Sequence, residues 1–271
     1  MGCVPVLFWR FIDSGPCSAA YNMALDEAIV TNVRKDLSPP VLRIYEWDRP
    51  SVSIGAFQKT SDIDFDYCVK NNIPIVRRLT GGRAILHKDE ITYSFSAKTL
   101  NGIFSKGLFD SYKKICLALS HAFTEIGLVT QSKLCKKNLK QHIQTIRNPL
   151  CFHSISYGEI MINGNKIVGS AQKRWPDGML QQGSIPLLID NSEMLRIFRL
   201  SNSQLKQKTI NGLKEILPEL HYIDLKNAIY SAFENIFNIQ FIISSPSQEE
   251  ISFAKELEEK KYNSKEWTFK R

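Results

Sequence analysis

Apolar residues along the chain follow two different spacings, which divide it into a strand-rich first part and a helix-rich last part. In the first part, short runs of β-branched and aromatic residues are separated by turn residues, a pattern typical of strands. We expect strands at residues 8–12, 41–47, 51–54, 73–76, 84–86, 90–96, 157–162, 166–172 and 181–187. From about residue 191 the spacing predicts helices at 192–200, 203–216, 224–236 and 247–261, with one short strand at 241–243.

Turn residues between these runs predict how the strands connect. Asp13 to Pro16 is expected to turn the chain, and Asp48-Arg49-Pro50 is expected to join its two flanking runs into a strand pair. Asn163-Gly164 predicts a tight hairpin, because this dipeptide suits the left-handed conformation of such turns. Pro186 indicates an edge strand or a bulge.

The first helix is expected after Ser18, a residue type that caps helix N-termini. Asn22, Asp26 and Glu27 are its polar members and are interpreted as a solvated face. Its apolar stripe comprises Tyr21, Ala24, Leu25, Ala28 and Ile29. Two further helices are expected at 62–70 and 108–126.

Together these elements predict an α+β fold, in which a mixed or antiparallel sheet is flanked by helices. The change of spacing predicts a soft boundary, with a main domain at 1–190 and a small helical C-terminal extension packed on it at 191–271. With 271 residues, 43% of them hydrophobic, the chain can build a sizeable core.

Charge and cysteine content narrow the class of protein. No apolar run approaches the ~18 residues of a membrane span, and no signal peptide is recognisable at the N-terminus. The six cysteines form no CxxC pair and no zinc spacing, which favours a reducing, cytoplasmic setting and no bound metal. The net charge of +8 suggests an acidic partner. Since no nucleic-acid-binding motif accompanies it, we expect an acidic protein, and neither nucleic acid nor a membrane.

The stretch from Val76 to His87 carries the densest candidate chemistry. Arg77-Arg78 follows an apolar run, and a turn through Gly81-Gly82 leads to Arg83. Paired glycines let a ligand approach the main chain closely, and guanidiniums around such a turn suit acyl carbonyls, phosphates or nucleotides. The alternative is a hairpin with a cationic tip and no function.

Cys151 and Lys166 are further candidates. Cys151 follows Asn-Pro in a predicted turn rather than lying on an apolar helical stripe. A catalytic thiol requires a partly exposed, electropositive setting, which the basic segment 133–147 can supply, either as a docking patch or as a solvated loop. Lys166 follows the hairpin and can polarise a carbonyl. A structural cysteine and a surface lysine are the alternatives, and His87 and His153 are possible bases.

Four separate motifs resemble those of one known family. The sequence from Arg77 to His87 resembles the signature of the biotin/lipoate protein ligase catalytic-domain superfamily, and Asn163 to Gln172 resembles its lysine motif. The likeness extends to residues 22–28 and 261–267, so it covers nearly the whole chain. It implies the fold predicted above, with the catalytic domain at 1–190.

Within that superfamily the chain is most similar to the cysteine-dependent octanoyltransferase branch. Cys151-Phe152 precedes the lysine hairpin where that branch carries its nucleophile, and Arg83 stands where ATP-using ligases typically have a third glycine. Two residues depart from the branch, because His153 occupies an often acidic position and Gln182 one where histidine is common. These departures bear on the choice of acceptor and on rate.

The resemblance implies an acyltransferase of lipoate biosynthesis that needs no cofactor. Octanoyl-acyl carrier protein would donate the acyl group to Cys151 as a thioester, and a lysine of a lipoyl domain or of the glycine cleavage H protein would accept it. Lys166 is then the second catalytic residue, and a monomer is expected. The implied substrate-binding residues are Arg77, Arg78, Gly81, Gly82, Arg83, His87, Gly169, Ser170, Ala171 and Gly183.

Three other functions remain open from the sequence. An ATP-dependent lipoate–protein ligase is the nearest, followed by an amidotransferase that moves octanoyl from H protein to other lipoyl domains. The third is a non-catalytic regulator that binds an acyl group or cofactor, against which the presence of both Cys151 and Lys166 argues.

Overall fold

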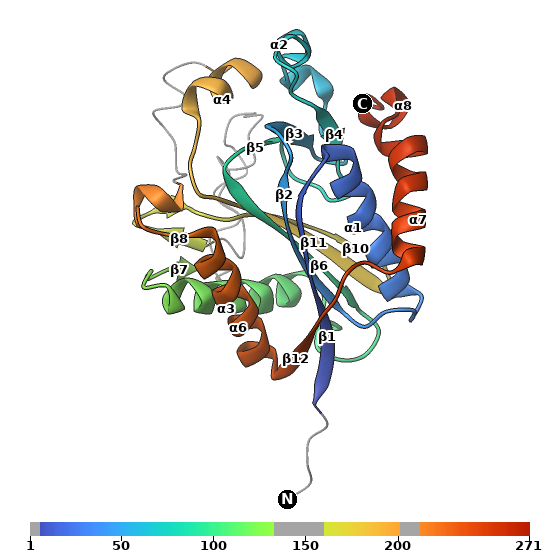
Figure 1. Ribbon diagram of the computed structural model, residues 1–271, viewed down its shortest axis with the longest axis vertical. Coiled ribbons are helices and arrows are strands. Elements are labelled where there is room, and N and C mark those ends of the chain that lie inside the picture. Colours follow the sequence, from blue (N-terminus) through green and yellow to red (C-terminus); the bar gives the residue numbers. More distant parts are fainter. Residues whose placement is uncertain (1–5, 133–159, 201–211) are drawn as a thin grey trace, which may run out of the picture.

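The computed structural model describes residues 6–132, 160–200 and 212–271. Its centre is a six-stranded mixed sheet (Figure 1). The strands are β1 (Leu7–Cys17), β2 (Val41–Trp47), β6 (Glu90–Lys98), β10 (Gly169–Arg174), β11 (Gly178–Pro186) and β12 (Ile239–Ile243). They lie in the order β10-β11-β6-β2-β1-β12, where β2, β1 and β12 are parallel and the remaining neighbours antiparallel.

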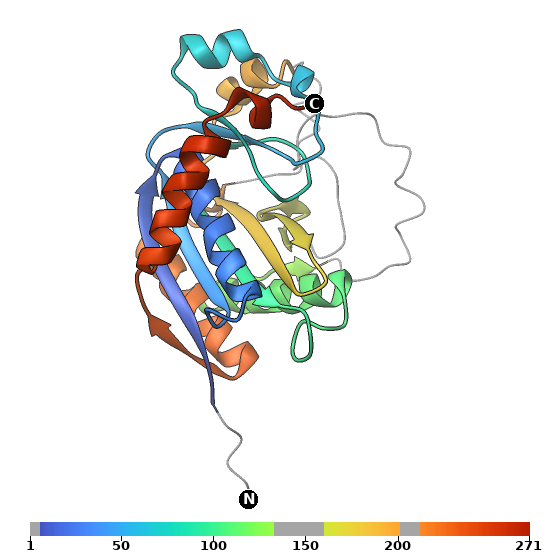
Figure 2. The same cartoon turned by 90° about the vertical axis from the view of Figure 1, so that its right-hand side faces the viewer.

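Helices cover both faces of this sheet (Figure 2). One face packs against α3 (Leu108–Glu125) and α6 (Tyr222–Phe237), and the other against α1 (Ala19–Arg34), which is in turn covered by α7 (Gln248–Leu257). Successive apolar residues of β2 therefore pack into two different buried cores, which explains why apolar residues occur on both faces of this strand. This arrangement confirms the predicted α+β fold.

The remaining described strands form two small sheets. One consists of β3 (Ser51–Ile54), β4 (Ile75–Arg77) and β5 (Ile85–His87), and packs against α2 (Phe65–Lys70) and α4 (Asn191–Ile197). The other consists of β7 (Gln131–Ser132), β8 (Ile160–Ile162) and β9 (Asn165–Lys166). Short helical turns occur at η1 (Thr60–Asp62), η4 (Leu213–Glu215), η5 (Glu258–Tyr262) and α8 (Lys265–Thr268). No helix within the described ranges is both long enough and apolar enough to cross a membrane.

Several local predictions are confirmed by cap and turn geometry. Ser18 accepts a hydrogen bond from the main-chain N–H of Tyr21 and so begins α1. The Asn163-Gly164 turn has positive φ at both residues, 50° and 78°, and joins β8 to β9. Ser247 and Glu250 form a capping box at the start of α7.

Other predictions failed where long-range pairing decides the structure. β2 and β3 do not pair with each other, because Asp48-Arg49-Pro50 carries the chain from the main sheet to a small one. Asp13 to Pro16 does not end β1, since the strand continues through a bulge in which Gly15 has φ 60°. Pro186 ends β11, an interior strand rather than an edge.

The polar residues of α1 are not a solvated face. Asn22 and Asp26 are 0% and 1% exposed, and Glu27 bonds to Lys261 in the C-terminal segment. The prediction failed because the helix is covered on two sides, by the sheet and by α7.

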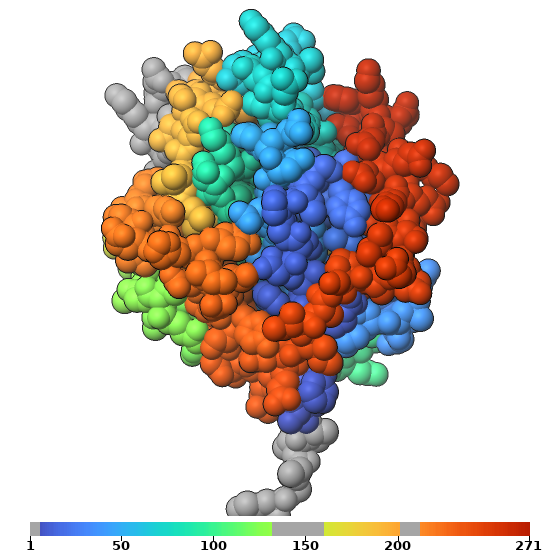
Figure 3. Space-filling model, viewed as in Figure 1, coloured from blue at the N-terminus to red at the C-terminus, as the bar shows by residue number. Residues whose placement is uncertain are grey.

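The C-terminal segment packs over the rest of the molecule. β12 forms the edge strand beside β1, and α7 lies against the N-terminal segment at the surface, as the neighbouring red and blue atoms in Figure 3 show. The expected helix at 203–216 falls largely outside the described residues, and the boundary near residue 190 stays a prediction.

Candidate active site

A cavity lies where the main sheet, the β4-β3-β5 sheet and α1 meet. It holds about 330 Å³ of space that no atom fills, part of it open to solvent. Its apolar walls are Met23, Tyr45, Trp47, Ile85 and Ala171. Its other lining residues are Ser53, Arg78, His87, Thr92, Gly169, Ser170, Gln182, Gly183 and Ser184. Apolar walls with a few placed polar groups are typical of small-molecule sites.

The fold brings together predicted site residues from distant motifs. Six of the predicted substrate-binding residues line the cavity, namely Arg78, His87, Gly169, Ser170, Ala171 and Gly183. Strands β10 and β11 are antiparallel neighbours and place Gly183 directly opposite Ser170. Residues of the glycine motif (76–87) and of the lysine motif (163–172) therefore line one cavity.

The predicted nucleophile lies outside the described residues, together with His153 and the basic segment 133–147. Lys166 is described, lies on β9 and is only 3% exposed. It precedes Gly169, a lining residue, by three positions, so the lysine motif leads directly into the cavity wall. Its catalytic role stays a prediction.

Arg77 is fully buried and donates to main-chain carbonyls. Its Nη1 lies 2.7 Å from Gly55 O and 2.8 Å from Gln58 O, and its Nε lies 3.0 Å from Thr268 O. Burial lowers the pKa of this guanidinium from its usual value. The side chain thus ties the start of the glycine motif to the C-terminal segment, and its contact with substrate stays a prediction.

Arg78 shapes the glycine turn and also lines the cavity. Its Nη2 donates to Gly81 O and Arg83 O, both at 2.7 Å, so the guanidinium bridges the two ends of the turn. Its Nη1 donates to the carbonyl and the hydroxyl of Ser53, both at 3.0 Å. Charge-assisted bonds to four acceptors fix the turn relative to β3.

His87 is the centre of a buried series of hydrogen bonds. Its Nδ1 lies 2.7 Å from Glu90 Oε1, and its Nε2 lies 2.7 Å from Ser53 Oγ. The indole of Trp47 stacks on the imidazole with ring centroids 3.9 Å apart. An imidazole between a carboxylate and a hydroxyl is held in one orientation at the cavity wall.

Two further hydroxyls hold the Glu90 carboxylate. Ser184 Oγ donates to Glu90 Oε2 at 2.5 Å, and the hydroxyl of Thr92 donates to Oε1. Trp47 Nε1 donates to Thr92 Oγ1 at 2.8 Å, which also fixes the stacked indole. The polar end of the cavity is therefore connected by hydrogen bonds from β2 through β6 to β11.

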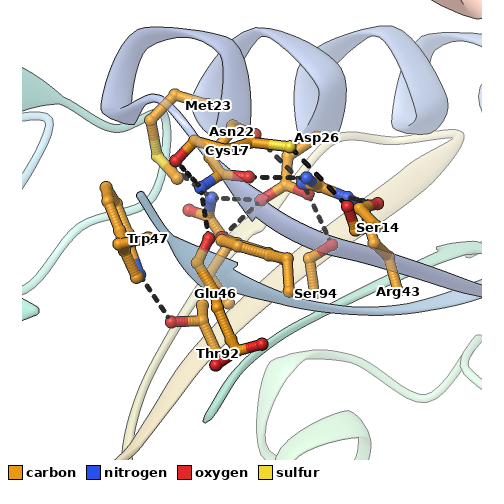
Figure 4. A network of polar contacts seen from close by, with 12 residues as sticks. Ser14, Cys17, Asn22, Met23, Asp26, Arg43, Glu46, Trp47, Thr92 and Ser94 are labelled. Atoms are coloured by element: carbon orange, nitrogen blue, oxygen red, sulfur yellow. Dashed lines mark hydrogen bonds and ion pairs between the residues drawn. The ribbon is translucent and has the colours of Figure 1, made fainter. Parts of the chain in front are cut away.

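A second buried network underlies the other side of the cavity (Figure 4). Asp26 forms an ion pair with Arg43 at 2.8 Å, and both side chains are fully buried. The same carboxylate accepts from Ser94 Oγ at 2.6 Å, Tyr45 Oη at 3.0 Å and Gln182 Nε2 at 2.7 Å. Four donors on one carboxylate satisfy the charge that burial would otherwise make costly.

Gln182 joins this network to the glycine motif. Its Oε1 accepts from Thr80 Oγ1 at 2.8 Å while its Nε2 donates to Asp26. The amide can serve both partners because it carries a donor and an acceptor at once. The residue identified as a departure from the family pattern is therefore a lining residue that links α1 to the Thr80 turn.

The Tyr93 side chain forms hydrogen bonds with β10 and β11, which contribute lining residues to the cavity. Its hydroxyl lies 2.8 Å from Ser170 Oγ and accepts from Gln181 Nε2 at 2.9 Å. Burial raises the pKa of Tyr93 to about 12, so the phenol stays neutral near pH 7. A Cβ on Gly183 would lie 2.1 Å from the Tyr93 ring, so this position has no space for a side chain.

Several lining residues could not be assigned a role from the sequence. Tyr45 and Trp47 look like ordinary strand residues, and Met23 lies in the family-like stretch 22–28 without a predicted role of its own. Ser53 and Thr92 alternate with apolar neighbours along their strands, a pattern that equally suits an ordinary solvent-facing side. Ile85 and Ser184 were placed in strands without a role.

Comparison with known proteins identifies the family. Residues 18–234 match the family model described as the lipoyl protein ligase A/B catalytic domain. The chain is 33% identical to octanoyltransferase LipM of Anoxybacillus flavithermus and 33% identical to octanoyltransferase LipM of Bacillus subtilis, covering in each case 97% of this chain and 98% of the relative. Relatives of this kind confirm the prediction of an enzyme, an acyltransferase.

Solved structures show the same fold at lower identity. A lipoate-protein ligase A bound with ATP superposes with a TM-score of 0.81 at 22% identity, covering 97% of this chain and 99% of that one. A bipartite lipoate protein ligase from Thermoplasma acidophilum gives 0.80 at 20% identity, covering 97% and 96%. The chain therefore belongs to the lipoyl protein ligase A/B catalytic-domain family, as its motifs predicted.

Proposed function

We propose that this protein transfers an octanoyl group from octanoyl-acyl carrier protein to a lysine of a lipoyl domain or of the glycine cleavage H protein, in the cytoplasm. The observation that carries the proposal is full-length similarity to octanoyltransferases combined with Cys151 immediately before the lysine hairpin. The ligase structures share the fold at 20–22% identity, which leaves the choice of reaction to the sequence.

The reaction proceeds in two steps through Cys151. Its thiolate attacks the carbonyl carbon of the octanoyl thioester and forms a new thioester on the enzyme, and the carrier sulfur leaves as a thiolate that takes up the proton Cys151 had released. The neutral amine of the acceptor lysine then attacks the enzyme thioester. The Cys151 sulfur leaves and takes up the proton lost by the attacking nitrogen, so an amide and the free Cys151 thiol result. Because an amide is more stable than a thioester, ATP is not consumed.

The described residues support binding and orientation for this reaction. The apolar walls at Met23, Tyr45, Trp47 and Ile85 suit an aliphatic chain. Lys166 polarises the carbonyl, and main-chain N–H groups near Gly169 and Ser170 stabilise the oxyanion. Arg77, Gly81, Gly82 and Arg83, which do not line the cavity, are further substrate-binding residues in this proposal.

An acylation assay tests the proposed function. The full-length protein is mixed with octanoyl-acyl carrier protein without ATP, and its intact mass is measured. We expect one added octanoyl group, which a lipoyl domain discharges and which the Cys151→Ser variant does not acquire. Cys116→Ser is the matched control, because Cys116 lies in the core on α3 and burial raises its pKa to about 11.

The other outcomes identify the alternatives. Product formed only with ATP and free octanoate or lipoate would show a ligase. An adduct formed only from octanoyl-H protein would show an amidotransferase. No adduct and no product under any of these conditions would contradict catalysis and favour a binding regulator.

A further inference from the structure

Cationic and aromatic side chains gather on the surface beside α1. Lys173 and Arg34 lie over the ring of Trp175, at 5.0 and 4.6 Å from its centroid. Lys270 and Lys261 lie over the ring of Trp267, at 3.4 and 4.1 Å. The cationic aromatic surface, as we call it, consists of Arg34, Lys173, Trp175, Lys261, Trp267 and Lys270.

One apolar cluster makes this surface continuous. Trp175 comes from the end of β10 and Trp267 from α8, more than 90 positions apart, yet both pack against buried Val30, Leu79 and Leu180. Two half-exposed indoles thus share a single apolar base. Exposed aromatic and cationic residues on a rigid base are the composition of protein-binding hot spots.

Positive charge exceeds negative charge on this surface. Glu27 pairs with Lys261 at 2.7 Å, and Asp177 pairs with Arg34 at 2.9 Å. Lys173 and Lys270 also feel neighbouring cations: burial lowers the pKa of each, and the charge of Lys261 lowers both further. Glu27 opposes this effect at Lys173. Mutual repulsion between the lysines costs stability, which an anionic partner would recover.

The surface begins at the rim of the cavity. Ala171 lines the cavity, and Lys173 follows it by two positions on β10, so the two side chains point to the same face about 7 Å apart. On the neighbouring strand β11, Leu180 of the apolar base precedes Gln182 of the cavity in the same way. A partner docked on this surface therefore has a short path to the cavity.

We propose that the cationic aromatic surface docks the acidic carrier protein that donates the acyl thioester. This inference rests on the proposed function. An acidic protein complements the charge, and the arm that carries the thioester includes a phosphodiester, which the ammonium of Lys173 can pair with between the surface and the cavity. Long-range attraction would raise the association rate rather than change the chemistry.

The test compares two donors in the first half-reaction. Acylation of the full-length enzyme is followed by intact mass in single turnover, with octanoyl-acyl carrier protein or with octanoyl-pantetheine, a small thioester without phosphate or carrier. For the Lys173→Glu/Lys270→Glu double variant we expect about a tenfold lower rate constant with the carrier at low salt, and an unchanged rate with octanoyl-pantetheine. High salt should reduce the difference between variant and parent.

A matched control distinguishes an effect of this surface on the acylation rate from an effect of net charge alone. Lys106→Glu/Lys113→Glu changes the charge equally at exposed residues on and just before α3, which covers the other face of the sheet. This variant should be acylated by the carrier at nearly the parent rate. Equal slowing of both variants would overturn the proposal.

Three further results separate the possible failures. Unchanged acylation of the Lys173→Glu/Lys270→Glu variant by the carrier overturns the docking proposal. Normal acylation followed by slow transfer to a lipoyl domain also overturns it, because the surface would then dock the acceptor. If neither donor acylates the parent enzyme, the proposed function itself fails.

Discussion

At the scale of single residues, a substitution at Gly81 tests how closely a ligand approaches the glycine turn. A Cβ built on Gly81 meets nothing within 4 Å, so Gly81→Ala should leave the unfolding temperature nearly unchanged. If the substrate lies against this main chain, as the sequence predicts, the added methyl group should slow acylation of the enzyme about tenfold or more. Thermal unfolding and the single-turnover rate measure the two effects separately.

Gly55→Ala provides the contrasting variant. A Cβ there would lie 2.0 Å from the carbonyl oxygen of Gly82, so the glycine turn would have to move. We expect a loss of about 1–3 kcal/mol in the free energy of unfolding together with lower activity. Gly81→Ala protein with normal stability and normal activity would show that no ligand contacts the turn at that point.

The roles of single residues could be predicted only where a short stretch of sequence carries the signal. The paired glycines and Gly183 stand out in the sequence, and Gly183 lines the cavity. Burial is set by distant segments, however, so Asp26 was misinterpreted as solvated although α7 and the sheet enclose its helix. The hydrogen bond from Arg77 to Thr268 likewise depends on a segment 191 positions away.

At the scale of elements, the Asp26–Arg43 pair joins α1 to β2 under the cavity. In Asp26→Asn the Arg43 charge stays buried without its counterion, and an amide nitrogen replaces one acceptor oxygen. We expect a loss of about 3–5 kcal/mol in the free energy of unfolding. Urea denaturation monitored by tryptophan fluorescence measures it.

Glu27→Gln is the control one position along the same helix. The Glu27–Lys261 pair is partly exposed, with side chains 19% and 23% accessible, so solvent screens it. The expected loss is at most about 1 kcal/mol. Equal losses for the two variants would contradict a special role for the buried network.

The type of each element could be predicted, because the spacing of apolar residues and helix capping are local properties of the sequence. Which strands pair with one another could not be predicted. The runs at 41–47 and 51–54 are both strands, as expected, but they belong to different sheets. Two strands joined by three residues commonly form a hairpin, and only the pairing of β3 with β4 and β5 prevents it here. The cavity depends on that separation, since Tyr45 of the main sheet and Ser53 of the small sheet both line it.

At the scale of the whole molecule, stability should fall in alkaline solution. Cys68 lies in the core of the small sheet and Cys116 in the main core, and burial raises the pKa of each thiol from 9.0 to about 11. The folded state therefore favours the neutral thiols. This contribution is complete below pH 9 and is lost as the pH rises toward 11, on the order of 2 kcal/mol for each thiol.

The two cysteines lie in two different cores, so their titration also tests whether these cores unfold together. We expect the urea midpoint to fall between pH 9 and 11 in a single transition seen by both fluorescence and circular dichroism. The Cys68→Ala/Cys116→Ala variant should be less stable at pH 7 but should lose less stability over this interval. Tyr93, whose pKa burial raises to about 12, should add a further loss above pH 10 in both proteins. A urea midpoint that falls as steeply with pH in the variant as in the parent would show that groups other than these two thiols control alkaline unfolding. Two separate transitions would show that the small-sheet core unfolds independently of the main core.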